Sequence, residues 1–207
     1  MRLKRFEIRN FKSIESLSVE WDDLLVLIGE NNSGKSTVLS ALSFFLSGGG
    51  IKDPSIFRRH QTDTANAIEL VGHFDQLSIN EQQQVAVRGR MHNDTWVLKK
   101  RYWLEAGDGE DQERGGWKEQ LFSYSSQESF NGWPEPDTTW ASFPPDYQTL
   151  IQQLQGHPAR PNAAAREALR ELLRMHRQDL VVMGTPAWLP NPGGGGNWKS
   201  NANSIIP

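Results

Sequence analysis

Residues 29–36 read Gly-Glu-Asn-Asn-Ser-Gly-Lys-Ser, and they follow the apolar run Leu-Leu-Val-Leu-Ile at residues 24–28. The stretch matches the phosphate-binding loop (P-loop) pattern G-x-x-x-x-G-K-[ST] at every position. The apolar run predicts a strand buried on both faces, and residues 34–46 place apolar side chains at helical spacing. Because this pattern requires a strand before the loop and a helix after it, the stretch predicts a P-loop nucleotide-binding fold of the α/β class.

The residue types in this loop suit the binding of a polyphosphate. Glycine at positions 29 and 34 allows backbone angles that a side chain forbids, so successive N–H groups can surround an anion at the positive end of a helix. Lys35 can reach the β- and γ-phosphates and is the predicted catalytic residue, while the hydroxyl of Ser36 can bind Mg²⁺. The predicted ligands are ATP and Mg²⁺, and the predicted nucleotide-binding residues are Gly29, Glu30, Asn31, Asn32, Ser33, Gly34, Lys35, Ser36 and Thr37.

Composition limits the class of protein. The chain has 207 residues, a formal net charge of -3 and no cysteine. The charge argues against a nucleic-acid coat protein or a polybasic membrane binder, and the lack of cysteine excludes disulfide scaffolds and cysteine metal sites. Since no apolar run approaches the ~20 residues that span a bilayer, and no signal peptide is evident, we expect a cytoplasmic protein without a membrane partner.

The charge distribution suggests three segments. Residues 105–145 are acidic and rich in glycine, proline and tryptophan, without periodicity, which predicts an exposed insertion. It separates a P-loop lobe at residues 1–104 from a helical part and irregular tail at residues 146–207.

Local patterns predict the elements within these segments. Alternating or continuous apolar residues predict further strands at residues 2–9, 17–21, 67–74, 84–91 and 95–104, of which the last three would form an antiparallel meander. Helical spacing predicts helices at residues 147–154 and 163–176, the second with Asn162 as its N-cap. The last 25 residues predict no element.

Two segments resemble a known family. Residues 6–14 read Phe-Glu-Ile-Arg-Asn-Phe-Lys-Ser-Ile, and together with residues 26–37 they resemble the start of ABC-type ATPase heads, which include SMC proteins, RecF-type recombination proteins and OLD (overcoming lysogenization defect) endonucleases. The loop sequence Gly-Glu-Asn-Asn-Ser-Gly-Lys-Ser-Thr is most similar to that of OLD-like ATPases. Residues 67–74 and 96–102 are similar to antiparallel strands of that family's first lobe, and the resemblance becomes thin after residue 104.

This resemblance implies the first lobe of an ATPase head, with a mixed sheet, an antiparallel strand meander and a C-terminal helical part. It implies a homodimer or larger assembly around ATP, with DNA engaged only through the complete protein, in repair or antiphage defence. It also implies that Lys12, the basic residue of the Asn-Phe-Lys-Ser segment, lies near the nucleotide.

The sequence also departs from that family. No apolar strand ending in Asp-Glu follows Lys35, because the run at residues 180–183 ends in Gly-Thr. Residues 46–50, Leu-Ser-Gly-Gly-Gly, imitate the family's signature but follow the P-loop helix, whose end presents carbonyls, so we interpret them as a glycine stop. No acid cluster resembles a Toprim nuclease domain. The sequence thus predicts the first part of a longer ATPase or a shortened relative, with ATP hydrolysis left open and no nuclease activity of its own.

Two alternatives remain open. The chain could be a complete small P-loop phosphotransferase that uses Arg58, Arg59 or Arg101 as transition-state cations. It could instead be a non-catalytic module with a structural P-loop, in which a tryptophan-rich region binds a partner. Against the latter, tryptophans in long loops more often hold the loop onto the body, which is our interpretation of Trp117, Trp133 and Trp140. The arginine series 166, 170, 174 and 177 is interpreted as a solvated helix face.

Overall fold

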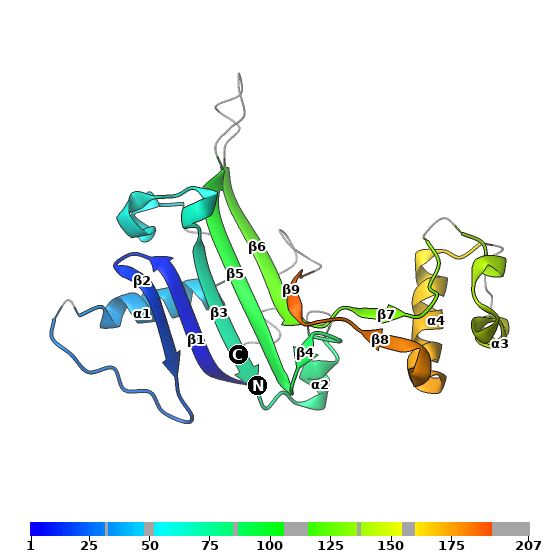
Figure 1. Cartoon of the computed structure of the whole chain (residues 1–207). Coiled ribbons are helices and arrows are strands. Elements are labelled where there is room, and N and C mark those ends of the chain that lie inside the picture. Colours follow the sequence, from blue (N-terminus) through cyan, green and yellow to red (C-terminus); the bar gives the residue numbers. More distant parts are fainter. Residues whose placement is uncertain are drawn as a thin grey trace, which may run out of the picture. The chain divides into compact units, whose positions relative to one another are not determined.

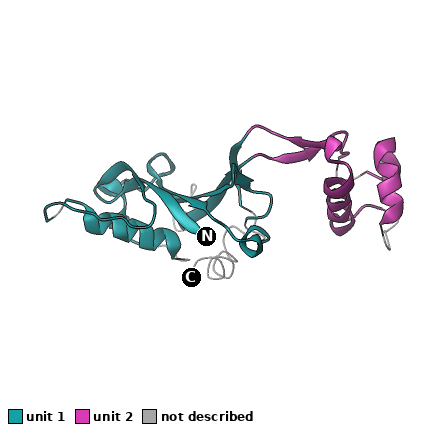
Figure 2. Cartoon of the chain, turned by 90° about the horizontal axis from the view of Figure 1, so that it is seen from below, with its two compact units in different colours: residues 1–125, 186–207 teal, residues 126–185 magenta. Residues whose placement is uncertain are grey.

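The structure, a computed structural model, describes residues 1–31, 33–47, 52–84, 87–105, 116–135, 138–154 and 160–191. The chain divides into two compact units, residues 1–125 with 186–207 (unit 1) and residues 126–185 (unit 2), shown in Figure 2. Unit 2 is therefore an insertion into the chain of unit 1, which contains the P-loop.

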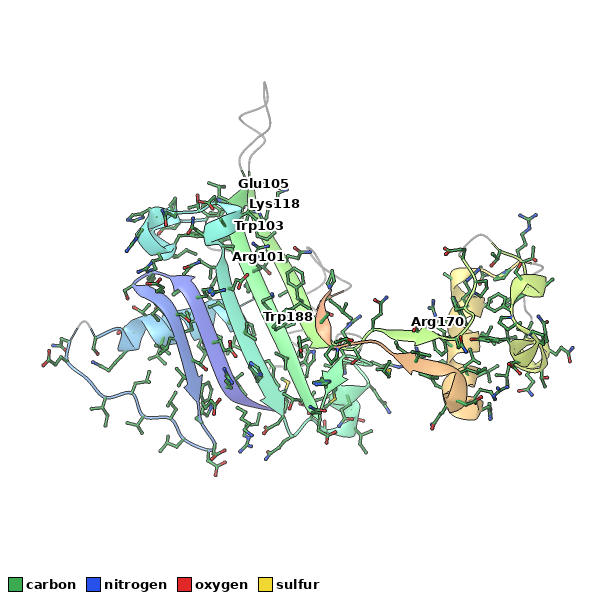
Figure 3. The ribbon with its side chains drawn as sticks, in the orientation of Figure 1. Arg101, Trp103, Glu105, Lys118, Arg170 and Trp188 are labelled. Atoms are coloured by element: carbon green, nitrogen blue, oxygen red, sulfur yellow. The ribbon has the colours of Figure 1, made fainter. Side chains whose placement is uncertain are left out.

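An antiparallel sheet forms the body of unit 1 (Figure 1). Among the described residues it has seven strands in the order β2-β1-β3-β5-β6-β9, with the short β4 paired to β5. Their bounds are β1 (Arg2–Phe11), β2 (Ile14–Glu20), β3 (Ile68–Asp75), β4 (Met91–His92), β5 (Thr95–Glu105), β6 (Gly116–Ser125) and β9 (Ala187–Pro190). At the far ends of β5 and β6, Lys118 and Glu105 form an ion pair of 3.0 Å, visible in Figure 3.

One helix, α1 (Lys35–Leu46), packs against this sheet through aromatic rings. Phe45 lies 5.4 Å from the ring of Phe6 on β1 and 6.3 Å from that of Phe74 on β3, while Phe44 meets Tyr102 of β5 edge-on at 5.3 Å. The core of unit 1 therefore lies between α1 and the alternate, inward side chains of β1, β3 and β5.

Short turns complete unit 1 between α1 and β5. They comprise the 3-10 turns η1 (Pro54–Ile56), η2 (Arg58–His60) and η3 (Thr64–Asn66) and the single-turn helix α2 (Ile79–Gln82). Ser78 and Glu81 form a capping box at the start of α2, which satisfies the main-chain N–H groups there.

Unit 2 has a core of its own. It contains β7 (Glu128–Phe130) paired with β8 (Val181–Met183), the helices α3 (Pro145–Gln153) and α4 (Ala163–His176), and the turns η5 (Trp140–Ser142) and η6 (Gln178–Leu180). Buried side chains from these elements pack together, among them Phe143, Tyr147, Leu169 and Leu173.

The α/β class predicted from the sequence is confirmed, as are most of its elements. Helix α4 has the predicted bounds, and Asn162 caps it by accepting a hydrogen bond of 2.8 Å from the N–H of Ala165. The meander strands β3 and β5 also lie where alternation predicted them.

The strand predicted at residues 24–28 is wrong. This segment belongs to no strand, and the side chains of Leu24, Val26 and Ile28 are 79%, 63% and 90% exposed. The parallel part of the expected mixed sheet is therefore missing within the described residues, where every strand pair is antiparallel. The physical reason is that no described strand lies beside this run to pair with it.

Three further predictions need correction. The strand predicted at residues 84–91 is not present in the described part of that range apart from Met91, which begins β4; residues 87–89 form a turn, and the carbonyl of Gln84 accepts hydrogen bonds from the N–H groups of Val87 and Arg88. The predicted insertion at residues 105–145 contains β6, which pairs with β5 in the sheet of unit 1, and β7, which pairs with β8 in unit 2. The last 25 residues do include a strand, β9, although residues 192–207 lie outside the described part.

Candidate phosphate-binding site

The P-loop, residues 29–36, is folded around the ammonium of Lys35. Lys35 Nζ donates hydrogen bonds to the main-chain oxygens of Gly29 at 2.7 Å and Glu30 at 2.6 Å, and it lies 3.2 Å from Ser33 Oγ. The N–H of Ser33 donates to the carbonyl of Glu30 at 3.2 Å. These contacts join the end of the loop to its beginning, so the loop makes a closed turn. The predicted ligand Asn32 lies outside the described residues.

Two glycines make this turn possible. Gly34, the N-cap of α1, has a φ of 93°, in the region that side chains disfavour. At Gly29, an added Cβ would lie 2.7 Å from Ser33 Oγ, which is closer than real Cβ contacts. Gly34 therefore has the backbone conformation expected from the sequence, whereas the constraint at Gly29 is the space beside the side chain of Ser33.

The start of α1 presents main-chain N–H groups to the loop. The first helical hydrogen bond runs from Val38 N to Gly34 O at 3.1 Å, so the N–H groups of Lys35, Ser36 and Thr37 come before the helical ladder. Within the described part of the chain, no main-chain oxygen accepts from these three groups, and the first turn of α1 has no acidic residue. A helix start of this kind attracts anions. The loop residues therefore fit a phosphate group.

The far end of α1 is held by a buried lysine that the sequence analysis missed. Lys100 of β5 is fully buried, and its Nζ donates to the main-chain oxygens of Phe44 at 3.0 Å and Ser47 at 3.2 Å. Burial lowers the pKa of Lys100, and Glu119, whose Oε2 lies 3.3 Å away, opposes that effect. Lys100 thus satisfies carbonyls at the end of the helix whose start forms the P-loop. The available signal was its inward position in the alternation of β5.

Lys12 lies beside the middle and end of α1. It occupies the tight turn between β1 and β2 with a φ of 50°, and its N–H donates to the carbonyl of Ile56 at 2.7 Å. Its side chain lines a cavity of about 460 Å³ together with Phe11 and the α1 residues Leu39, Ser40, Ser43, Phe44 and Ser47. Its predicted position near the nucleotide stays a prediction.

The basic residues of the alternative phosphotransferase contact other groups. Arg58 forms an ion pair of 2.6 Å with Glu15, and Arg101 donates to the carbonyl of Thr64 at 2.7 Å. Arg59 lies in the turn η2 with a φ of 55°. Among the described residues, no group of three or more His, Cys, Asp or Glu side chains could hold a metal ion. The structure thus brings none of these cations to the P-loop through a described contact.

The tryptophans of the predicted insertion pack into the two units. Trp117 stacks on Tyr102 at 5.6 Å, and Trp133 and Trp140 pack against Phe143 at 5.2 Å and 5.4 Å. This packing agrees with the interpretation that they hold the segment in place.

The arginine series of α4 is not a solvated face throughout. Arg166 is buried in unit 2 and donates to the main-chain oxygens of Pro134 and Glu135. Arg170 and Arg174 form ion pairs of 2.8 Å and 2.9 Å with Glu167 and Glu128. The helix therefore offers fewer exposed cations than its sequence suggests.

Comparison with known proteins adds to this geometry. The family model described as AAA ATPase domain matches residues 1–155, which is most of the chain and includes the whole P-loop. The chain belongs to the AAA ATPase domain family. Membership in an ATPase family implies ATP as the nucleotide, in agreement with the ligand predicted from the loop.

The AAA ATPase domain also has a curated relative. The chain is 37% identical over 79 residues to an OLD nuclease of Thermus scotoductus (strain ATCC 700910 / SA-01), and this match covers 35% of the chain and 14% of the relative. The chain thus spans about one seventh of the relative that it matches. This similarity agrees with the resemblance of the P-loop sequence to OLD-like ATPases.

A solved structure from work on ATP-driven dimerization and DNA-stimulated activation of SMC ATPases is similar to part of the AAA ATPase domain. The two are 17% identical with a TM-score of 0.38, over 57% of this chain and 68% of the other. None of the helices in the described ranges has the length and apolar character needed to cross a membrane.

Proposed function

We propose that residues 29–37 bind the phosphates of ATP together with Mg²⁺, and that this chain is the nucleotide-binding part of a larger ATPase. The observation that carries the proposal is the closed turn around Lys35, which leaves the first N–H groups of α1 facing the loop. Membership in the AAA ATPase domain family supports ATP as the nucleotide.

Each loop residue has a role in this proposal. The main-chain N–H groups of Gly34, Lys35 and Ser36 and the ammonium of Lys35 would hold the phosphate oxygens, while the hydroxyl of Ser36 would bind Mg²⁺. Glu30, Asn31, Asn32 and Ser33 would supply the rest of the loop, Thr37 would contact the α-phosphate, and Lys12 is a secondary candidate. Bound ATP with Mg²⁺ supplies the phosphoanhydride bond on which an ATPase acts.

The wider role is also proposed. By its similarity to an OLD nuclease, we infer that the complete protein acts on DNA in the cytoplasm, in repair or antiphage defence, and assembles as a homodimer or larger complex around ATP. The match covers a small part of that relative, so the residues that would act on DNA lie in the rest of such a protein.

The loop proposal is tested by titrating the chain with Mg²⁺ and ATP in a calorimeter, for the wild type and for Lys35→Ala. We expect the variant to bind about ten- to one-hundred-fold more weakly, because a hydrogen bond to a charged group contributes ~1.5–3 kcal/mol. Lys4→Ala removes an exposed lysine of β1 and serves as the control, with an affinity equal to that of the wild type. Equal binding by wild type and Lys35→Ala would refute the proposal.

A further inference from the structure

The sheet of unit 1 has a second face, opposite to the one that packs against α1, and we call it the outer face. On β5, Leu98 and Tyr102 belong to the buried core beside α1. Because side chains alternate along a strand, the residues at 97, 99, 101 and 103 point to the outer face. The strand register places on the same face residue 9 of β1, residue 69 of β3, residues 118, 120, 122 and 124 of β6, and residue 188 of β9.

Aromatic rings and cations lie side by side on the outer face. Lys99 Nζ is 4.3 Å from the ring centre of Trp188 and 5.0 Å from that of Phe122. Two residues farther along β5, the guanidinium carbon of Arg101 is 5.5 Å from the ring centre of Trp103. Figure 3 labels Arg101 and Trp103 on β5 and Trp188 on β9, and Trp188 is 36% exposed. Each of these cations is therefore held beside an aromatic ring.

The charges on this part of the outer face do not balance. Glu69 lies between Arg9 and Arg101 in one cross-strand row, at 3.8 Å and 3.5 Å from them. Burial lowers the pKa of Lys99, Glu69 opposes that effect, and repulsion from Arg101 and Arg9 adds to it. Three cations against this one carboxylate leave two positive charges in excess. The ion pair at the far ends of β5 and β6 adds no net charge. An anion at this place would reduce the repulsion.

We propose that the outer face binds a single strand of nucleic acid. Its phosphates would contact Lys99, Arg101 and Arg9. Its bases would stack on Trp188 and Trp103. Proteins that bind single strands combine a row of cations with aromatic rings on which successive bases stack. In a duplex the bases are already stacked on one another, so the rings could not contribute.

A nucleic acid fits this surface better than an acidic protein segment does. Both would satisfy the cations, but a base also offers a flat π face to each indole, which a carboxylate does not. The chain as a whole has a net charge of -3, so the attraction depends on the local excess of positive charge and not on the whole molecule. The proposal concerns the binding of a strand and not its cleavage. It rests on neither the P-loop nor the similarity to the OLD nuclease.

Fluorescence anisotropy of labelled probes tests the proposal on the full chain without added nucleotide. The probes are a thymidine strand of about 20 nucleotides, a uridine strand of the same length, and a mixed-sequence DNA duplex of that length. We expect at least one of the single strands to bind about tenfold or more tightly than the duplex, and the comparison of the two strands assigns DNA or RNA. Between about 50 mM and about 200 mM salt, three phosphate contacts predict a slope of about -2 in log affinity against log salt concentration.

Matched variants locate the binding. Trp103→Leu with Trp188→Leu keeps apolar side chains but removes both stacking surfaces, and it should weaken the strand at least about tenfold. Lys99→Gln with Arg101→Gln leaves one phosphate contact and should reduce the salt slope to about -0.7. Circular dichroism of each variant confirms that the fold is retained.

The control is a cation that lies beside a ring elsewhere in the chain. Arg170 of unit 2 has its guanidinium carbon 4.9 Å from the ring centre of Trp133. Arg170→Gln should therefore leave both the affinity and the salt slope unchanged.

Four outcomes would overturn the inference. Failure of both single strands to bind would refute it directly, and equal affinity for the strands and the duplex would exclude base stacking. An affinity unaffected by Trp103→Leu with Trp188→Leu would place binding elsewhere. A glutamate peptide that competes as well as the unlabelled strand would identify an acidic protein segment as the partner.

Discussion

Gly34 lies at the junction between the P-loop and α1. Two reasons could require glycine there, the backbone conformation or a lack of space for a side chain, and the structure distinguishes them. Its φ of 93° is unfavourable for any residue with a Cβ, yet an added Cβ would meet no atom within 4 Å. The need for glycine at this position therefore comes from backbone conformation alone and owes nothing to crowding.

This separation leads to a prediction for Gly34→Ala. We expect the free energy of unfolding to fall by ~1–2 kcal/mol, because a left-handed conformation costs an alanine about that much. Gly116→Ala is the matched control, since a Cβ there also meets no atom within 4 Å but the backbone has no positive φ, and we expect a change within ~0.5 kcal/mol. Urea denaturation measures both. A loss of equal size in the two variants would show that the conformation of Gly34 is not what matters.

Among individual residues, the backbone conformation of Gly34 could be expected from the sequence, whereas the buried position of Lys100 could not. The role of glycine at 34 follows from the pattern, because backbone angles are local properties, whereas at Gly29 the structure shows crowding by Ser33 instead. Lys100 could not be assigned in advance, because its partners Phe44 and Ser47 lie more than fifty positions earlier in the chain. A lysine in a strand is usually solvated, and only the packing of α1 over β5 makes this one a buried donor.

Among the elements, the contact between α1 and β3 determines where the P-loop helix lies. Phe45 of α1 rests on Gly72 of β3, where an added Cβ would come within 2.7 Å of the ring carbon Cε1. The ring is also enclosed by Phe6 and Phe74, so it has little room to move away.

We therefore predict that Gly72→Ala destabilises the chain by ~1–3 kcal/mol through overpacking. Phe45→Leu replaces the ring by a smaller side chain, which leaves room for the added Cβ. The loss of stability in the double variant should therefore be smaller than the sum of the losses in the two single variants. A double-mutant cycle in urea measures this coupling. Strictly additive losses would mean that the helix does not rest on Gly72.

The sequence predicted an element correctly where the signal lay within the element itself. It failed where the element depends on residues that are distant in the sequence. Helix α4 has an N-cap and one apolar stripe, both contained within its own residues, and its bounds were predicted correctly. Residues 24–28 have the composition of a buried strand, but a strand also needs a neighbour, and none is present in the described residues. For β6 the acidic composition of the surrounding segment was misleading, because the strand itself carries only one basic and one acidic residue, Lys118 and Glu119.

Across the whole molecule, the two units occupy different parts of the chain and have separate hydrophobic cores. Among the described residues, the buried cluster of unit 1 contains none from 126–185, and every member of the buried cluster of unit 2 lies within 126–185. The insertion leaves from Ser125 of β6 and returns to Ala187 of β9, and these two residues are directly paired in the sheet.

We predict that unit 2 can be removed without loss of the P-loop site. Replacing residues 126–186 by Asn-Gly would join Ser125 to Ala187 through a two-residue hairpin turn. Cooperative thermal unfolding and the affinity for ATP with Mg²⁺ should both be retained, the affinity within about twofold.

The control for this deletion removes β9 as well, by replacing residues 126–190. It loses the pairing of β9 with β6 and the contact of Trp188 with Tyr124, so it should unfold at a lower temperature. If the shorter deletion alone abolished nucleotide binding, the site would depend on unit 2.

The pairing of Ser125 with Ala187 also has a consequence for how the chain reaches its native state. Strand β9 leaves the ribosome only after the sixty residues of unit 2, and closing a flexible loop of that length costs ~4 kcal/mol of chain entropy. Unit 2 reduces this cost when it folds first, because β7 pairs with β8 and the N–H of Gly184 donates to the carbonyl of Gln127, which brings its own ends together. We therefore expect unit 2 to fold before β9 pairs with β6 during synthesis, so that β9 is the last strand to join the sheet of unit 1.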